Sequence, residues 1–330
     1  MAPMFVYSGN GTQAGLSHTE SEAGISLSEL IIQLEGTPAG ELLALALALL
    51  SALAHAILGA IHKSGIDPFL NRGAVNITFS VIAAPFALFV VPWPSAELFG
   101  VLAIAFLVHL AYELLQATSF QFGAFTLVYP IARGTGPLIT AFLALLVFGE
   151  RLEITQWMGL LLLSGAILSL AWANLRAMDT TPASGGAFVP AIAAALLTGV
   201  MIAVYTIVDA YGIRLASDPF AFLAWFFFIG GFGSPVYAYW RWLHLAPGRR
   251  PPIGDLAARG LFGALLAYVS FGAIMLATRL GNVGEAAAIR EVSIIFATGI
   301  GVLIFREKID LTRIVIIGLI VAGAVLVEFH

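Results

Sequence analysis

Ionisable side chains are few inside the long apolar stretches of this sequence. Each would cost roughly 2.5 kcal/mol or more to place in hydrocarbon, so each requires a partner or a function. The chemistry open to them is the binding of charged groups and the transfer of protons. They are His55, His109, Glu113, Arg133, Asp209, Arg290 and Glu291.

Arg133 is the strongest candidate for binding an anionic group. Tyr129, Pro137 and Thr140 are spaced to share one helix face with it, while two prolines and two glycines between residues 130 and 137 argue against an unbroken helix. We expect the helix to restart near Pro137, so that its N-terminal dipole and the guanidinium face one carboxylate or phosphonate group. The alternative is a permanent ion pair with Glu113 or Asp209 that only holds helices together.

Arg290 follows Arg133 by 157 residues, and Ser293 lies one turn further on. We expect both arginines to line one cavity near the middle of the membrane, with Tyr129, Thr140 and Ser293 beside them. The alternative for Arg290 is a position near the interface, because it lies close to the start of its apolar stretch and a long side chain can reach water from there.

Glu113, Asp209 and Glu291 are candidate proton carriers. A carboxyl group in low-dielectric surroundings holds its proton more firmly unless an arginine neutralises it. Two arginines against three acids leave one acid unpaired. For Glu113, an ion pair with an arginine is the alternative.

No catalytic constellation or metal site is predicted. His55 and His62 share a helix face but lie about 10 Å apart along the axis, too far to bind one metal ion, so helix packing is their expected role. The chain has no cysteine, and it contains no nucleotide-binding loop, lipase-type serine motif or zinc-protease motif. We therefore expect neither an enzyme nor a bound cofactor.

Apolar stretches of about 20 residues, the length that crosses a bilayer, must position these side chains. Of the 330 residues, 60% are hydrophobic and 10% are charged, which indicates an integral membrane protein. The net charge of −4 and the lack of a basic cluster exclude DNA and RNA as partners. The expected spans are 41–61, 72–92, 97–117, 122–148, 155–175, 188–211, 219–241, 257–278, 284–305 and 311–328.

An internal duplication organises these ten expected spans. Residues 148–155 resemble residues 305–312 at a shift of 157, and Asp67-Pro-Phe69 recurs as Asp218-Pro-Phe220 at a shift of 151. Because each copy holds five spans, the second copy must enter the membrane from the opposite side, as in many transporters. The predicted fold is all-α, with ten transmembrane helices in two inverted five-helix repeats. The expected regions are a polar acidic tail 1–40, a first repeat 41–176, a linker 177–187 and a second repeat 188–330.

Several motifs carry a family resemblance. They are Glu150-Arg151 and Glu307-Lys308 at the ends of equivalent segments, Pro137 thirteen residues before Glu150, His55-Ala56 with Lys63, Tyr129 to Pro137, Tyr205 to Asp209, and Arg290 to Ser293. From about residue 42 to 328 the chain resembles the EamA-type members of the drug/metabolite transporter superfamily. Gly59, where relatives often have Asn, and Ile294, where proline is expected, depart from the pattern.

The resemblance implies a ten-helix secondary transporter, often an exporter, located in the bacterial inner membrane. With the arginines, it predicts efflux of a small anionic or zwitterionic solute by alternating access, with proton coupling as an option. A membrane-embedded enzyme, a lipid-handling protein and a channel are the alternatives. The expected partners are the lipid bilayer and the solute, and a homodimer is left open.

Two lines of reasoning disagree about orientation. Ten Lys and Arg residues fall in odd-numbered loops or their flanks and three in even-numbered ones, which places both termini outside. The resemblance implies cytoplasmic termini.

Overall fold

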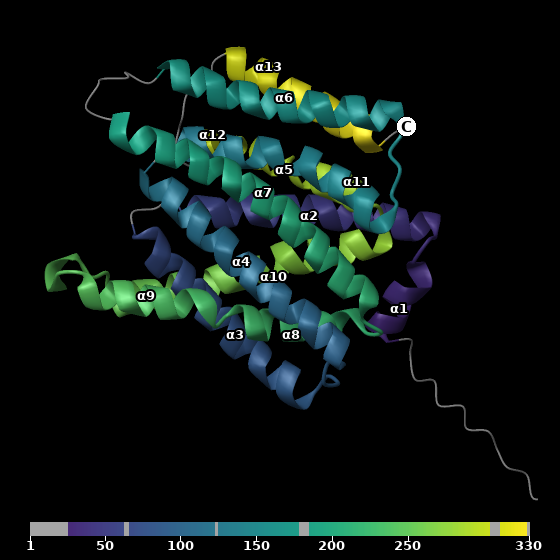
Figure 1. Ribbon diagram of the computed structural model, residues 1–330, viewed down its shortest axis with the longest axis horizontal. Helices are drawn as coiled ribbons and strands as arrows, with labels where there is room; N and C mark the ends of the chain where they lie inside the picture. The colour runs from purple at the N-terminus through teal and green to yellow at the C-terminus, as the bar shows by residue number, and fades with distance from the viewer. Residues whose placement is uncertain (1–25, 63–65, 123–124, 178–184, 304–310, 329–330) are drawn as a thin grey trace, which may run out of the picture.

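The computed structural model describes residues 26–62, 66–122, 125–177, 185–303 and 311–328. Every regular element in these ranges is a helix. Glu307 and Lys308, and most of the expected tail and linker, lie outside the described ranges. Most of the long helices run in roughly the same direction, so their ends gather at two opposite ends of the molecule (Figure 1).

The first half contains α1 (Leu27–Leu34), α2 (Pro38–His62), α3 (Pro68–Phe89), α4 (Ala96–Phe122), α5 (Phe125–Phe148) and α6 (Ile154–Ala177). The second half contains α7 (Gly185–Leu215), α8 (Pro219–Gly230), α9 (Gly233–His244), the 3₁₀ turn η2 (Pro247–Arg249), α10 (Ile253–Leu280), α11 (Val283–Arg290), α12 (Ser293–Leu303) and α13 (Leu311–Glu328).

Nine segments of the described chain are long and apolar enough to cross a membrane, with α8 and α9 counted together. They agree with nine of the ten expected spans. The remaining expected span, 284–305, is divided between α11 and α12, and neither of these helices reaches the length of a span by itself. The all-helical membrane architecture is therefore confirmed.

The repeated Asp-Pro-Phe motif starts a helix in each half. An Asp67 carboxylate oxygen accepts hydrogen bonds from the backbone N–H groups of Phe69 at 3.0 Å and Leu70 at 3.4 Å. Asp218 does the same for Phe220 at 2.8 Å and Ala221 at 3.2 Å. Proline follows each aspartate at the first helical position, where its missing N–H leaves no intrahelical bond unmade. The motif fixes where α3 and α8 begin.

Helices from the two halves pack against one another throughout the molecule. In the centre, α2 packs against α10, α11 and α12, while α7 packs against α4 and α5. At one edge α3 packs against α8 and α9, and at the other edge α6 packs against α13 (Figure 1). The core therefore lies between the halves rather than within either one.

Glycines bring α6 and α13 into backbone contact. A Cβ atom placed on Gly159 would lie 2.7 Å from the Gly323 carbonyl oxygen, and one placed on Gly323 would lie 2.8 Å from the Gly159 carbonyl oxygen. No side chain fits at either position. Small residues promote this kind of association because dispersion forces grow as helix backbones approach.

The expected break near Pro137 is wrong, because α5 runs from Phe125 to Phe148 with both prolines inside it. Two threonine hydroxyls bond within the helix: Thr140 donates to the Gly136 oxygen at 3.0 Å, and Thr135 donates to the Ile131 oxygen at 3.1 Å. Neither accepting carbonyl is one that lost its N–H partner to a proline. Proline is tolerated in membrane helices when neighbouring helices support the segment, and α6 and α7 pack against α5.

The interruption occurs instead in the second half, between α11 and α12. The backbone N–H groups of Glu291 and Val292 bond to carbonyls three residues earlier, Ala288 and Ile289, each at 3.0 Å. Ile294 continues this pattern by bonding to the Glu291 carbonyl at 3.0 Å. A short 3₁₀ segment within a helix frequently marks a hinge. Arg290 and Glu291 thus lie at a tightened turn between two helices.

Candidate functional site

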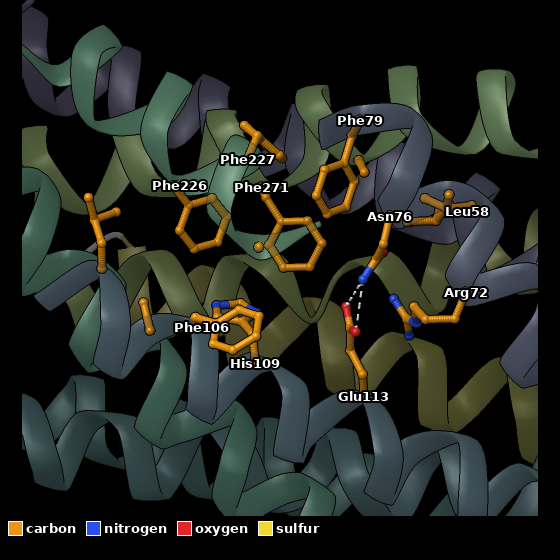
Figure 2. A pocket seen from close by; sticks show the side chains of 15 residues that line it. Leu58, Arg72, Asn76, Phe79, Phe106, His109, Glu113, Phe226, Phe227 and Phe271 are labelled. Atoms are coloured by element: carbon orange, nitrogen blue, oxygen red, sulfur yellow. Dashed lines mark hydrogen bonds between the residues drawn. The ribbon is translucent and has the colours of Figure 1, made fainter. Parts of the chain in front are cut away.

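A cavity lies between α2, α3, α4, α8 and α10. Aromatic rings from four helices form much of its wall (Figure 2). A site of this kind holds an apolar group by burying its surface, and a few polar groups fix its orientation. The aromatic rings are those of Phe79, Phe106, Phe226, Phe227 and Phe271.

Glu113 is the acidic group of this cavity. The Asn76 side-chain amide on α3 lies 2.9 Å from both of its carboxylate oxygens, and the Ser234 hydroxyl on α9 donates to one of them. Figure 2 shows the carboxylate pointing across the cavity toward Asn76. These donors stabilise a carboxylate without supplying a positive charge. The expected ion pair between Glu113 and an arginine is not formed within the described residues.

Arg72 is the basic group of the same cavity. Its guanidinium donates to the Gln116 side-chain oxygen and lies 5.9 Å from the centre of the Tyr112 ring. Gln116 in turn donates to the Tyr112 hydroxyl at 2.7 Å. No carboxylate among the described residues forms an ion pair with Arg72. Arg72 and Glu113 therefore face one cavity with opposite charges and neutral hydrogen-bond partners.

A second cavity adjoins the first. The two share Leu58, Arg72 and Phe271 as lining residues. The second also reaches His55 and Tyr129 deep in the protein, and Gly59 toward the end of α2. A continuous lining therefore leads from the end where α2 finishes and α3 begins toward the centre of the molecule.

Charged and polar side chains form a layer across the centre, which we call the central polar layer. Its members are His55, Arg133, Tyr205, Arg290 and Glu291. Arg133 Nη1 lies 2.9 Å from Glu291 Oε1, and each of these two side chains is 3% exposed. Arg290 lies 3.4 Å from both the Tyr205 hydroxyl and His55 Nδ1. It forms no ion pair with a described residue.

Several polar atoms in and around this layer are buried without a hydrogen-bond partner in the described structure. Buried polar groups normally have partners, so this cluster marks a place where water or a bound group is accommodated. Carboxylates and guanidiniums have further bonding capacity even when one of their atoms is paired. The atoms are Arg133 Nη2, Asp209 Oδ1, Arg290 Nε, Glu291 Oε2 and Ser293 Oγ.

His109 connects the aromatic cavity with Asp209. His109 Nε2 lies 2.8 Å from Asp209 Oδ2, and both residues are buried. The imidazole stacks on the Tyr205 ring, with centroids 4.5 Å apart and planes at 29°. Another edge of the ring lines the cavity. This pair joins α4 of the first half to α7 of the second.

The opposite end of the molecule contains another cavity, lined by residues such as Leu45, Ala48 and Ile289. None of the five residues of the central polar layer lines it, but Ile289 directly precedes Arg290 in the chain. Cavities therefore lie at both ends of α2, and the second cavity reaches His55 of the layer.

Comparison with known proteins identifies the family. Residues 189–329 match the model of the EamA-like transporter family. The match covers most of the second half of the chain and confirms the family predicted from the sequence. The apolar helices and this match support an integral membrane protein.

Solved structures support the fold, whereas no curated protein matches the chain. A structure titled only "Crystal structure of protein" is 18% identical, with a TM-score of 0.66, and the match covers 88% of this chain and 98% of that one. At this identity the likeness shows the fold alone. It extends over nearly all of this chain, including the first half.

The residues predicted to bind solute lie in three settings. Arg133 pairs with Glu291 rather than with Glu113 or Asp209, and Tyr129 lines the second cavity. Arg290 is 3% exposed and central, contrary to the interfacial alternative. Two residues have no cavity contact: Thr140, which bonds within α5, and Ser293, which is fully buried at the start of α12.

Sequence reasoning missed three polar residues around the aromatic cavity: Arg72, Asn76 and Ser234. Arg72 was expected at the end of a loop, because the second span was expected to start at residue 72. The Asp67-Pro68 helix start places it within the first turns of α3 instead. His109 was noticed as an ionisable residue inside an apolar stretch, but its partner and its place in the cavity were not predicted, because apolar residues surround it in the sequence of α4.

Proposed function

We propose that this protein is a secondary transporter that exports a small zwitterionic solute bearing an apolar or aromatic group, by alternating access. The observation that carries the proposal is the position of Arg72 and Glu113 in one aromatic cavity without an ion pair between them. A zwitterion would place its ammonium at Glu113, its carboxylate at Arg72 and its apolar group against Phe226, Phe227 and Phe271.

An inverted repeat of two five-helix halves accounts for the packing. In this scheme α2 to α6 form the first unit and α7 to α13 the second, with α8 plus α9 and α11 plus α12 each counting as one span. The contact between α2 and α10 then corresponds to that between α7 and α4, and α6 packs against its own equivalent, α13. This division agrees with the repeats 41–176 and 188–330 proposed from the sequence.

Alternating access needs a barrier that can be approached from each side. The central polar layer has this position, between the passage that contains Arg72 and the cavity that contains Leu45. Arg290, which forms no ion pair with a described residue, is the candidate for a second contact with the solute carboxylate during passage. Export and a bacterial inner-membrane location are part of the proposal and rest on the resemblance to drug/metabolite transporters.

A thermal-shift panel on the purified protein tests the charge preference. The probes are phenylalanine, phenethylamine, 3-phenylpropionate and serine, which separate the contributions of ammonium, carboxylate and ring. Ligands stabilise the folded state by about 2.7 kcal/mol at 100 times the dissociation constant. We expect phenylalanine to raise the unfolding temperature most, because it alone offers all three groups.

Charge variants make the test specific. Glu113→Gln should weaken binding of phenylalanine and phenethylamine but spare 3-phenylpropionate. Arg72→Gln should weaken binding of phenylalanine and 3-phenylpropionate but spare phenethylamine. Glu97→Gln and Arg249→Gln change exposed residues outside this cavity and are matched controls. The zwitterion assignment would be overturned if phenethylamine were the only stabilising probe and stabilised wild type and every variant equally. Flux of a binding probe into proteoliposomes then tests transport.

A further inference from the structure

His109 has two ring nitrogens in different surroundings. Nε2 is held at 2.8 Å by the Asp209 carboxylate, whereas Nδ1 forms no hydrogen bond with a described residue. Because His109 lines the aromatic cavity, a proton can reach or leave Nδ1 from that side. A carboxylate at one nitrogen fixes the ring orientation and stabilises the imidazolium that forms when the other nitrogen takes up a proton.

The groups that face this imidazole come from several helices. Asp209 and Tyr205 lie on α7, Tyr112 and Glu113 on α4, and Arg72 on α3. The helices α8 and α10 present only the rings of Phe226 and Phe271 to it. Arg290 lies behind Tyr205, whose hydroxyl it approaches at 3.4 Å. Of the charged groups, Asp209 contacts the imidazole directly, Glu113 and Arg72 share its cavity, and Arg290 is separated from it by Tyr205.

Glu113 follows His109 by four residues on α4, so both project from one helix face into the cavity (Figure 2). A positive group bound at Glu113 would lie beside the imidazole. Two positive charges at this separation repel each other strongly in a cavity with aromatic walls, where little water screens them. An ammonium at Glu113 and a proton on His109 therefore disfavour each other.

We propose that His109, oriented by Asp209, is the proton-binding site that couples transport to a proton gradient, and that the solute ammonium and this proton bind in competition. The inference rests on the proposed function, because it requires a solute with an ammonium group. When the ammonium binds at Glu113, the N–H bond at His109 Nδ1 breaks and the proton passes to water in the cavity. Solute and proton thus exchange across the membrane.

Calorimetric titration of the full-length protein in lipid nanodiscs tests this exchange. Phenylalanine is the probe, and binding heats are compared in buffers of different ionisation enthalpy, which gives the number of protons released per molecule bound. For wild type we expect proton release on binding within a series from pH 5.5 to 8, because a bound ammonium at Glu113 displaces the proton from His109.

Variants assign the released proton to its source. His109→Gln should bind phenylalanine without proton release, whatever its affinity, and Asp209→Asn should release less than half of the wild-type value. His244→Gln, which changes an exposed histidine on α9, should match wild type. The heats also report folding, because an unfolded variant shows no saturable binding. If His109→Gln does not fold, Asp209→Asn gives an independent test.

Two results separate this inference from the proposed function. If wild type binds phenylalanine without proton release, or if His109→Gln releases as many protons as wild type, the coupling site is refuted and the zwitterion site stands. If no phenylalanine binds to wild type, the proposed solute class fails, and the coupling inference fails with it.

Discussion

Arg133 and Glu291 form an ion pair of 2.9 Å that joins α5 to the turn between α11 and α12. One residue belongs to each half of the chain, and the pair is buried at the level of the central polar layer. Glu291 also lies where the backbone tightens into 3₁₀ geometry. The pair thus fixes the turn of the second half to the unbroken helix of the first.

Loss of one partner should destabilise the fold strongly. Arg133→Met leaves the Glu291 carboxylate buried without its cation, and breaking a buried pair in this way typically costs about 3–5 kcal/mol. Glu291→Met should cost a similar amount. The double variant should be less destabilised than the sum of the two, because no uncompensated charge remains. Unfolding midpoints of wild type, both single variants and the double variant, measured in one detergent, give the losses of stability. If the losses of the single variants add up to the loss of the double variant, the two residues are not coupled.

Glu150 joins helices at the end of the molecule at which α5 finishes. Its Oε2 accepts the backbone N–H of Val283 at 2.8 Å, and its Oε1 lies 2.9 Å from Arg214 Nη2. Arg214 also donates to the Thr278 and Gly281 carbonyls, each at 2.8 Å. One side chain therefore connects α5, α7 and the start of α11.

Glu150→Ala should loosen this end of the molecule, with a stability loss of about 1–3 kcal/mol for the unpaired groups left behind. Thermal unfolding measures the loss. Glu153→Ala is the control, because Glu153 is exposed three residues further along the chain. Equal unfolding temperatures for the two variants would contradict the joining role of Glu150.

The short helix α1 has a pH-dependent start. Ser26 and Glu29 form a capping box, in which the Ser26 backbone N–H and hydroxyl lower the pKa of the Glu29 carboxyl. A lowered pKa in the folded state means that the cap stabilises α1 at neutral pH and that this contribution is lost as the pH falls through the lowered value. Ser26→Ala should weaken the effect, because it removes the hydroxyl and keeps the backbone N–H.

A spin label on the exposed position 33 reports this change, because the natural chain has no cysteine to compete for labelling. In the Gln33→Cys protein, label mobility should rise on acidification to about pH 3, the range in which exposed carboxyls titrate. With Ser26→Ala added, mobility should already be high at pH 7. The same mobility in both proteins at pH 7 would show that the capping box does not order α1.

Much of the fold follows from the sequence because a bilayer restricts what a chain can do. Apolar length locates the spans, and the Asp67-Pro68 and Asp218-Pro219 pairs mark where two helices begin. The positions of Arg133 and Arg290 inside spans could also be predicted, since charged residues in hydrocarbon are rare. These are local properties, readable from neighbouring residues.

Pairings between distant helices could not be predicted. Arg133 and Glu291 are 158 residues apart, and nothing near either residue selects the other over Asp209. The rotation of α4 that places His109 and Glu113 in the cavity is equally hidden, because apolar residues occur on every face of this helix. The unbroken course of α5 accompanies its packing against α6 and α7, which the sequence around its prolines does not show.

Alternating access predicts opposite changes in labelling at two engineered cysteines. Gly59 lines the passage near the end of α2, and a Cβ placed there meets no atom within 4 Å, so Gly59→Cys should be tolerated. Leu45→Cys lines the cavity at the other end of the same helix. In sealed vesicles, a membrane-impermeant maleimide should reach Gly59→Cys and Leu45→Cys from opposite sides, which also establishes the orientation of the termini.

Transported solute should raise the labelling rate at one of these positions and lower it at the other, because rocking of two halves closes one passage as it opens the opposite one. When Glu150→Ala is added, the labelling rate at Leu45→Cys should rise relative to the rate at Gly59→Cys, because the substitution loosens the end of the molecule at which Leu45 lies. A cysteine at exposed Gln33 should be unaffected by solute and serves as the control for general reactivity. If solute increased labelling at both cavity positions together, the protein would contain a continuous pore, and the channel alternative would replace the transporter.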